Sequence, residues 1–401
     1  SLLASCRFLA PHAMAAHELE SDDSPSRGSS MRYLAAFGAV LVTAVAQRRF
    51  SRRDQKTGLP IGYAALLSLI TVALATANRV MYKVALVPLG NYVFFLAQFT
   101  TFGYVVAYWA ALVFNRSQGN VTDLQVDFAR QRWSTFAQIG CLEATSFLLG
   151  MLGAKALPGA ILPVLGQLYL VFQMTFSSTL LGRRYTAREL AGCAFCVLGV
   201  ITASAGGEGG SVHSLPLRPA ALFVISLALP ALGTVLKEGL FQDARRSCGE
   251  ELNVFVVNTL GSSFQALGVF LLLPVLASLQ GVGSSPSAMG AYLAEGAAAF
   301  GSQPFWPCLY LCMNLGFNVS ILMLLRTTSA VTVSLSVAAA VPATAFVFAS
   351  CNIPLIGKGE PLDRWFAMGL TFILLGLGLY HGWAEKLCPG KGPLDDSLLA
   401  E

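Results

Sequence analysis

The sequence is poor in charged residues. Only 12% of its 401 residues are Asp, Glu, Lys or Arg, about half the share of an ordinary soluble domain. Hydrophobic residues make up 55% of the chain, and the mean hydropathy is +0.63. The apolar runs are not separated by polar stretches long enough to form a soluble domain. These features indicate a protein that crosses a membrane several times, because about 20 apolar residues span the bilayer hydrocarbon.

The sequence also lacks the residue patterns of the common enzyme classes. Its four histidines are dispersed, and it contains no H-E-x-x-H, G-x-S-x-G or phosphate-loop motif. A C-x-x-C at Cys193 and Cys196 lies in an apolar run, with no second pair of ligands for zinc. We therefore expect no catalytic residue, no metal and no cofactor. The net charge of +5 comes from short loops and indicates membrane topology rather than nucleic-acid binding.

Ten apolar segments are each long enough for a membrane-spanning helix. They cover about residues 61–86, 91–114, 134–156, 160–181, 187–205, 219–241, 253–279, 305–326, 329–350 and 363–384. Most Lys and Arg residues then fall on the side shared by both ends of the chain, which the positive-inside rule places toward the cytosol or its equivalent. An odd number of spans would break this sorting, so two signals predict ten helices.

The two halves of the chain are alike. Ser68, Leu69, Ala73, Leu74 and Arg79 match Ser226, Leu227, Ala231, Leu232 and Lys237 at a constant offset of 158 residues. Leu198–Val200 also resembles Leu375–Leu377, at an offset of 177. Two units of five helices must be inverted relative to one another in the membrane, an arrangement that recurs in transporters with a midplane substrate site. Chance similarity between two apolar helices is the alternative.

This pattern predicts four regions. Residues 1–57 form a targeting or cytosol-side segment that could hold an interfacial helix. Residues 58–206 form the first five-helix repeat, and residues 207–385 form the second. The second repeat contains an extended loop at 280–304, in which AYLAEGAAAF could be a short surface helix. A tail follows at 386–401.

Several polar residues lie inside the apolar segments. Such residues are costly there and usually face a bundle interior or a wet cavity. We interpret Arg79 as an anion-attracting group in a solute pathway; the alternative is a cation that reaches the membrane surface beside a helix end. Glu143 is read as a proton-coupling carboxylate or a partner of Arg79, and otherwise as part of a structural ion pair. Lys237 and Glu238 are expected to form a salt bridge at the membrane boundary.

The residues expected to contact the solute are distributed over seven of the predicted helices. They are Asn78, Arg79, Gln98, Glu143, Gln167, Asn258, Asn318 and Ser334. Amide and hydroxyl groups are cheaper to bury than charges and commonly form hydrogen bonds between helices. Interhelical bonding is therefore the alternative interpretation for all of them except Arg79 and Glu143.

Several sequence segments resemble the chloroquine-resistance-transporter-like (CRT-like) proteins of plants and algae. They include TANRVMYKVALVPL, LPGAILPVLGQLYLVFQ, GTVLKEGLFQDA and MNLGFNVSILMLLRTTSAVTVSLS, and the resemblance covers about residues 60–384. It implies the all-α drug/metabolite transporter fold, with ten transmembrane helices arranged as two inverted five-helix repeats around a central cavity. It also implies that the position of Arg79 governs transport. Residues 280–304 contain no cysteine, so the cysteine-bonded loop of the parasite relative has no counterpart here.

The resemblance implies a secondary, alternating-access transporter of glutathione, gamma-glutamylcysteine or small peptides, with proton coupling as an option. The expected location is the plastid (chloroplast) envelope, or otherwise a vacuolar or lysosome-like membrane. The expected partners are the solute and the lipid bilayer, without nucleic acid, and a monomer is favoured. One alternative on the same fold is an exchanger of phosphorylated sugars or nucleotide sugars, which would need several cavity cations. Another is a membrane receptor or scaffold that transports nothing.

Overall fold

The computed structural model describes residues 61–155, 157, 165–204, 217–272, 274–275, 285–357 and 364–381. These residues are helical apart from short connections and one isolated bridge between Ile353 and Gly357. The predicted all-α class is therefore confirmed. The N-terminal segment 1–57 and the tail 386–401 lie outside the described residues.

The helices of the described chain follow one another through short connections. They are α2 (Ile61–Leu89), η2 (Gly90–Tyr92), α3 (Val93–Ser117), α4 (Asp123–Gln131), α5 (Trp133–Lys155), α7 (Leu168–Leu181), α8 (Ala187–Ser204), α9 (Leu217–Cys248), α10 (Val254–Leu271), α12 (Pro286–Ser302), α13 (Phe305–Thr327), α14 (Ala330–Ser350) and α15 (Arg364–His381). Each long helix overlaps one of the apolar segments expected from the sequence.

Six stretches among the described residues are long and apolar enough to cross a membrane. They are Tyr63–Ser117, Trp133–Ala154, Leu217–Cys248, Val254–Leu271, Phe305–Thr327 and Ala330–Ser350. The first stretch contains both α2 and α3, which are joined through η2. The protein is thus a multi-span membrane protein.

Local signals in the sequence set several helix ends. The side chain of Asn253 accepts a hydrogen bond from the backbone N–H of Phe255 (2.9 Å) and begins α10, and Ser329 accepts one from Thr332 (3.2 Å) and begins α14. Such caps satisfy backbone donors that have no partner within the helix. At the end of α7, Gly182 takes a left-handed conformation with φ of +65°, which glycine adopts without steric cost.

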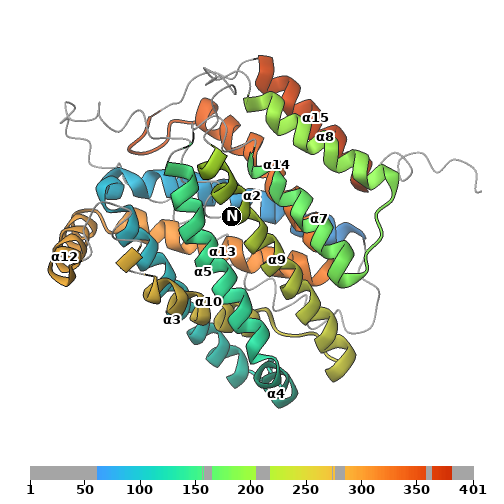
Figure 1. Ribbon diagram of the computed structural model, residues 1–401, viewed down its shortest axis with the longest axis horizontal. Helices are drawn as coiled ribbons and strands as arrows, with labels where there is room; N and C mark the ends of the chain where they lie inside the picture. The colour runs from blue at the N-terminus through green and yellow to red at the C-terminus, as the bar shows by residue number, and fades with distance from the viewer. Residues whose placement is uncertain are drawn as a thin grey trace, which may run out of the picture.

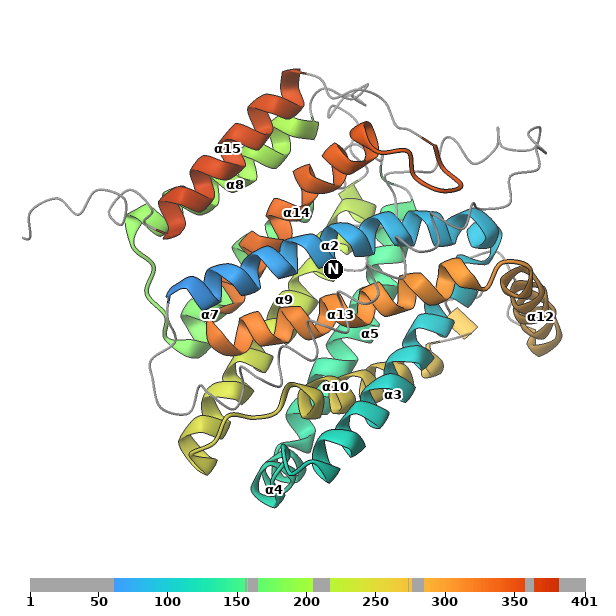
Figure 2. The same cartoon turned by 180° about the vertical axis from the view of Figure 1, so that it is seen from behind.

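The long helices pack mainly against partners that are distant in the sequence. Helix α2 packs on α13 and α14, while α9 packs on α5 and α7. Helix α10 contacts α3 and α5, and α8 pairs with α15 along their lengths. Figures 1 and 2 show α8 and α15 side by side at one edge of the molecule, next to α14. The first half of the chain is therefore interleaved with the second.

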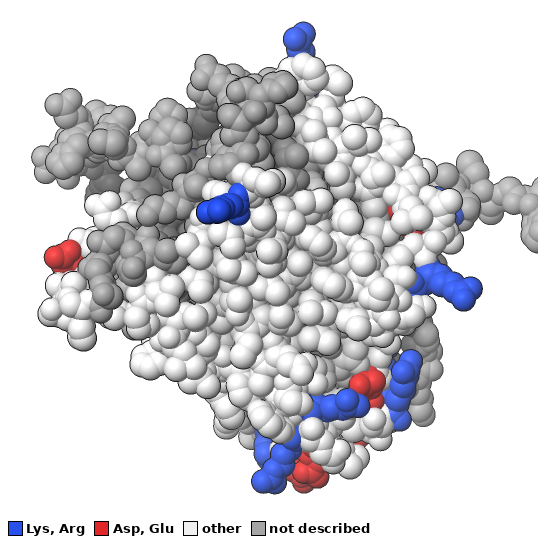
Figure 3. Space-filling model, in the orientation of Figure 1, with Lys and Arg blue, Asp and Glu red and all other residues white. Residues whose placement is uncertain are grey.

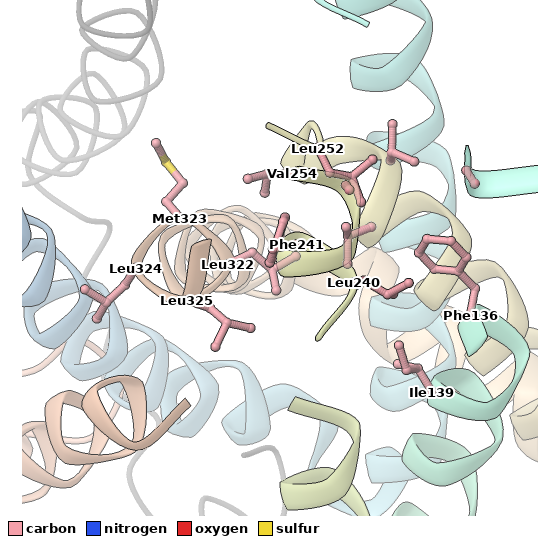
Figure 4. Close-up of a cluster of buried hydrophobic side chains, with 14 of the residues drawn as sticks. Phe136, Ile139, Leu240, Phe241, Leu252, Val254, Leu322, Met323, Leu324 and Leu325 are labelled. Carbon is pink, nitrogen blue, oxygen red and sulfur yellow. The ribbon is translucent and has the colours of Figure 1, made fainter. Parts of the chain in front are cut away.

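The largest buried apolar cluster joins α5, α9, α10 and α13. Phe136 and Ile139 from α5 are fully buried, and they share the cluster with Phe241 from α9 and Leu324 from α13 (Figure 4). Lipid tails are as apolar as leucine, so in a bilayer such a cluster holds helices together through close packing rather than through exclusion of water. It fixes the relative positions of the helices that carry the polar site described below.

The extended loop expected at 280–304 contains a helix of its own. Helix α12 begins after Ser285, whose hydroxyl accepts a hydrogen bond from the backbone N–H of Ala288 (3.2 Å), with Pro286 at the first helical position. It is longer than the AYLAEGAAAF segment predicted, because this cap and proline start it earlier. It packs on η2, α2 and α3, where the hydroxyl of Tyr292 accepts a hydrogen bond from the backbone N–H of Phe94 (3.3 Å).

Charged side chains gather toward one end of the molecule. In the face drawn in Figure 3 the middle is largely uncharged apart from an isolated blue patch above the centre, and most Lys, Arg, Asp and Glu atoms cluster near α4 and the end of α9. Two ion pairs lie in this region: Arg116 pairs with Asp123, and Arg132 pairs with Asp243, each at 3.1 Å. The distribution matches a membrane protein whose loops on one side carry most of the charge.

Candidate functional site

An ion pair lies inside the helix bundle, between α5 and α9. The Nζ atom of Lys237 lies 2.5 Å from Oε1 of Glu143, and the two side chains are 17% and 22% exposed. A close pair in a medium of low dielectric constant is held strongly, and removing one partner leaves a charge that is costly to bury. Of the alternatives for Glu143, the structure shows an ion pair, and its partner is Lys237 rather than Arg79. Lys237 and Glu238 do not pair with each other; Glu238 instead forms a salt bridge with Arg183 at 3.2 Å.

Three tyrosines interact electrostatically with the carboxylate of this ion pair. Tyr104 and Tyr108 of α3 are buried, and their rings stack with centroids 5.9 Å apart. Tyr169 of α7 forms a hydrogen bond with Thr234 of α9, at 3.1 Å between the oxygens. The carboxylate of Glu143 interacts electrostatically with the hydroxyls of all three tyrosines. Helices α3, α5, α7 and α9 therefore meet at one polar cluster.

Two asparagines connect helix α13 to the same cluster. The hydroxyl of Tyr104 donates a hydrogen bond to Oδ1 of Asn314. The side-chain amide of Asn318 donates to the same oxygen at 2.7 Å, and Asn314 donates to the hydroxyl of Tyr310 at 3.2 Å. Asn318 was among the expected site residues, whereas Asn314, Tyr104, Tyr108, Tyr169 and Lys237 were not. A tyrosine can pack as an apolar residue, so sequence alone gives little reason to select these three.

Arg79 lies on a different pair of helices. Its guanidinium donates from Nη2 to the backbone carbonyl of Val337 in α14, at 3.3 Å. Its neighbour Asn78 is 8% exposed, and Lys83 lies over the ring of Phe348 at 4.8 Å from the centroid. Among the described residues, no hydrogen bond or ion pair joins Arg79 to an acidic side chain. Its charge is therefore available for an anion.

Four of the expected site residues carry a buried polar atom that lacks a hydrogen-bond partner within the described chain. These atoms are Oδ1 of Asn78, Nε2 of Gln98, Nδ2 of Asn258 and Oγ of Ser334. A buried donor or acceptor without a partner costs about 1–3 kcal/mol, so such atoms mark places where water or a ligand is expected. The described hydrogen bonds do not link these residues to the Glu143 cluster. Gln167, the remaining expected residue, lies directly before α7.

Equivalent positions in α2 and α9 have the same local geometry. At the offset of 158 residues, Arg79 corresponds to Lys237 and Thr76 corresponds to Thr234. Thr76 donates to the carbonyl of Val72, and Thr234 donates to that of Pro230, both at 2.9 Å. Each helix thus carries a cation one turn beyond a threonine that bonds back to its own helix.

Helical segments that cross a membrane and enclose a charged polar cluster are typical of proteins that move solutes across membranes. The profile of one family, CRT-like (chloroquine-resistance transporter-like), matches residues 64–303. Protein CLT2, chloroplastic, of Arabidopsis thaliana is 41% identical over 329 residues, which cover 78% of this chain and 74% of the relative. The chain therefore belongs to the CRT-like family of transporters.

Two further relatives show the breadth of this similarity. Protein CLT3, chloroplastic, of Arabidopsis thaliana is 40% identical over 78% of this chain and 70% of its own length. The chloroquine resistance transporter of Toxoplasma gondii is 26% identical over 87% of this chain and 42% of its own length. These similarities cover more of the chain than the segment matched by the family profile, residues 64–303.

Proposed function

We propose that this protein is a secondary, alternating-access transporter of glutathione, gamma-glutamylcysteine or similar small peptides. The observation that carries the proposal is the Glu143–Lys237 ion pair inside the bundle of a CRT-like protein. An ion pair of this kind is costly to retain for packing alone, because well-packed apolar residues often stabilise a protein equally well. A role in binding a charged solute accounts for its presence.

The ion pair suits a zwitterionic amino-acid group. The gamma-glutamyl end of glutathione carries an ammonium and a carboxylate on one carbon. Lys237 can take the carboxylate and Glu143 the ammonium, so the solute replaces one ion pair with two. The hydroxyls of Tyr104, Tyr108 and Tyr169, which interact electrostatically with Glu143, would help to orient the group. Charge-assisted hydrogen bonds are roughly twice as strong as neutral ones, so this exchange offsets the cost of separating the pair.

Arg79 can bind the second carboxylate of such a peptide. Its described contact is to a backbone carbonyl, which leaves other guanidinium donors for a ligand. Arginine binds a carboxylate through two parallel hydrogen bonds. The buried polar atoms of Asn78, Gln98, Asn258 and Ser334 supply further hydrogen-bonding groups. An isolated drug cation would be repelled by Arg79, so anionic and zwitterionic peptides are the favoured class.

We further propose that the bundle consists of two inverted five-helix repeats, residues 58–206 and 207–385, with ten transmembrane helices in total. The helix contacts support this arrangement, because the packing of α2 on α13 and α14 has a counterpart in the packing of α9 on α5 and α7. In the two repeats α2 corresponds to α9, α5 to α13 and α7 to α14. Exchanging each helix for its counterpart therefore turns one set of contacts into the other. The matched geometry at Arg79 and Lys237 points the same way.

The contact between α8 and α15 adds independent support. At the offset of 177 residues, Gly192, Cys196 and Gly199 correspond to Gly369, Ile373 and Gly376. A Cβ on Gly376 would lie 2.6 Å from the carbonyl oxygen of Gly192, and one on Gly199 would lie 2.7 Å from that of Gly369. These two contacts are equivalent under a two-fold exchange of the helices, as expected where corresponding elements of inverted repeats meet.

We place the transporter in the plastid envelope, because three of its relatives at 37% to 41% identity are named chloroplastic. A vacuolar or lysosome-like membrane is the alternative location, and localisation of a fluorescent fusion of the full-length protein would separate the two. From the positive-inside rule we infer that the α4 end of the bundle faces the cytosol or its plastid equivalent, the stroma.

The ion pair can be tested without leaving a lone buried charge. We expect proteoliposomes with the wild-type protein to take up labelled glutathione in a saturable way. The double variant Glu143→Gln/Lys237→Gln should keep its fold but lose at least tenfold in uptake, because neutral amides cannot hold a zwitterion as strongly. The exposed Arg130→Gln, on α4, is the matched control and should transport normally. If the folded double variant took up glutathione normally, the ion pair would have a role in packing and none in transport.

The same vesicles separate the alternatives. An exchanger of phosphorylated sugars would take up triose phosphate only in exchange for an internal phosphate and would ignore glutathione. Among the described residues of the bundle, Arg79 and Lys83 have no acidic partner, and such a carrier would need several cavity cations to hold a phosphate. A receptor or scaffold would show no uptake of any solute, and glutathione would not stabilise it against thermal unfolding.

A further inference from the structure

A polar pocket opens at the charged end of the bundle, and Glu238, one of its lining residues, directly follows Lys237 of the Glu143 cluster along α9. Its volume is about 380 Å³, and it lies between the C-terminal part of α9, the end of α13 and the residue that follows Gly182 after α7. The residues that line it are Arg183, Glu238, Phe241, Gln242, Arg245, Arg246, Leu325, Arg326, Thr327 and Thr328. Four arginines thus converge on one hollow.

The carboxylates near this pocket do not neutralise the arginines. Glu238 pairs with Arg183 at 3.2 Å. Glu251 pairs with both Arg245 (2.7 Å) and Arg326 (3.4 Å). Among the described residues no ion pair involves Arg246. Four guanidinium groups therefore face two carboxylates, which leaves an excess of two positive charges around a partly enclosed space.

Membrane topology alone does not account for this arrangement. Cations are favoured on this side of the bilayer and near the C-terminal ends of helices. Neither preference requires the cations to face one another, and like charges in a confined space repel. Elsewhere on the same side, Arg116 and Arg132 each have an aspartate of their own. The converging arginines are arranged as they would be to surround an anion.

We propose that this pocket binds a phosphate-bearing anion. Guanidinium groups match phosphate oxygens with paired donors in a fixed plane, and several of them around one phosphate give both affinity and orientation. Partial burial strengthens the interaction, since Arg326 and Arg183 are only 17% and 34% exposed. The phosphate can belong to the headgroup of an anionic lipid or to a soluble phosphorylated compound, because the pocket lies at the membrane boundary.

Binding at this pocket would affect the start of helix α14 through Arg183. This arginine holds Glu238, whose other carboxylate oxygen accepts a hydrogen bond from the backbone N–H of Ala330 (2.8 Å), at the start of α14. A phosphate that contacts Arg183 competes with Glu238 for the same guanidinium. Helix α14 also carries Val337, the backbone partner of Arg79. The pocket is therefore placed to influence the transport site without forming part of it.

The test measures binding by the purified full-length protein in detergent. Inorganic phosphate should raise the midpoint of thermal unfolding more than chloride at equal ionic strength, and phosphatidylglycerol should do so more than phosphatidylcholine if the ligand is a lipid. Arg246→Gln should weaken the apparent affinity about tenfold, because it removes one charged contact. Arg246→Lys should retain part of the affinity, and Arg130→Gln, outside the pocket, should bind as the wild type does.

Each outcome has a definite meaning. Stabilisation by phosphate supports a soluble ligand, and stabilisation by phosphatidylglycerol alone supports a lipid headgroup; both require the effect to fall in Arg246→Gln. An equal effect in Arg246→Gln and Arg130→Gln, or no effect of either ligand, overturns the proposal. The double variant Glu143→Gln/Lys237→Gln should bind phosphate normally. The phosphate-binding result would therefore stand even if the transport proposal failed, and the transport proposal would stand if phosphate did not bind.

Discussion

Two cations inside the bundle have different surroundings and different consequences. Lys237 contacts a carboxylate directly, whereas Arg79 contacts a backbone carbonyl. A charge without a counterion is costly at membrane depth, and proteins retain it mainly where it has a function. Lys237 and Glu143 stabilise each other in the resting protein, while Arg79 keeps donors free for a ligand. The Glu143–Lys237 pair can therefore be tested by measuring stability, and Arg79 by measuring which solutes are transported.

We predict a clear order of stability at the ion pair. Lys237→Gln or Glu143→Gln alone should destabilise the protein by about 3–5 kcal/mol, because each leaves one buried charge unpaired. The double variant should be more stable than either single variant, since both charges are gone. Thermal unfolding of the four purified proteins measures this coupling. Strictly additive losses would mean that the two side chains do not interact in the folded protein.

Arg79 should discriminate between solutes by their number of carboxylates. Arg79→Ala should reduce uptake of glutathione about tenfold or more, because it removes a charged contact to the second carboxylate. Arg79→Lys should retain part of the activity, as a point charge replaces the planar donor pair. A solute with only one carboxylate, such as cysteine, should be affected less. Uptake by the wild type and the two variants at matched reconstitution levels provides the comparison, and equal uptake of glutathione by wild type and Arg79→Ala would remove this residue from the site.

At the scale of helices, close approach is controlled by small residues. Helices α8 and α15 meet where glycine lacks a side chain, with the backbone of Gly192 against that of Gly376. Small residues allow helix backbones to come near one another in a membrane, where van der Waals contact is a main source of association. Cys196 takes part in this seam, and its thiol donates to the carbonyl of Ile373 at 3.7 Å. The C-x-x-C of α8 therefore acts in packing.

A methyl group added to this seam should weaken it. A Cβ on Gly376 would lie 2.6 Å from the carbonyl oxygen of Gly192, so Gly376→Ala should force the helices apart and destabilise the protein by about 1–3 kcal/mol. The control is Gly290→Ala on α12, where nothing lies within 4 Å of the added carbon. That variant should be neutral or slightly stabilised, since alanine favours a helix. Thermal unfolding of both variants decides the matter, and equal stabilities would contradict the close packing of α8 on α15.

At the scale of the whole molecule, charged residues gather toward one end of the bundle, near α4 and the end of α9 (Figure 3). Helix α12 lies at the other end of the bundle, beside η2 (Figures 1 and 2). The polar cluster around Glu143 lies between helices that belong to both halves of the chain. A solute held there contacts both halves at once, which is the requirement for a transporter that alternates between two openings.

This orientation predicts the labelling of two surface positions. In a cysteine-free background, Ser117→Cys at the end of α3 and Ser287→Cys at the start of α12 should react with an impermeant thiol reagent from opposite faces of sealed vesicles. The physical reason is the span of α3, which carries the chain across the bilayer between η2 and α4. Labelling of both positions from the same face would contradict the arrangement, and disruption of the vesicles with detergent provides the control for accessibility.

The sequence by itself determined the class and the segments of this protein. Apolar length and charge distribution are local properties, so they identified the long helices; the short helix α4 (Asp123–Gln131), which is polar and lies in a loop, was not expected. They also identified Arg79 and Glu143 as unusual, because a charge inside an apolar run is visible in one dimension. The resemblance of TANRVMYKVALVPL and the other segments to CRT-like proteins gave the family.

Only the tertiary structure decided which charges meet. Glu143 lies 94 positions from Lys237 along the chain and 64 from Arg79, and nothing local distinguishes the two cations. The packing of α5 against α9 rather than α2 made Lys237 the partner and brought three tyrosines to the same place. Neighbours across a bundle depend on which helix faces pack together. That choice is made by many weak contacts distributed over the whole molecule, so it cannot be read from any single segment.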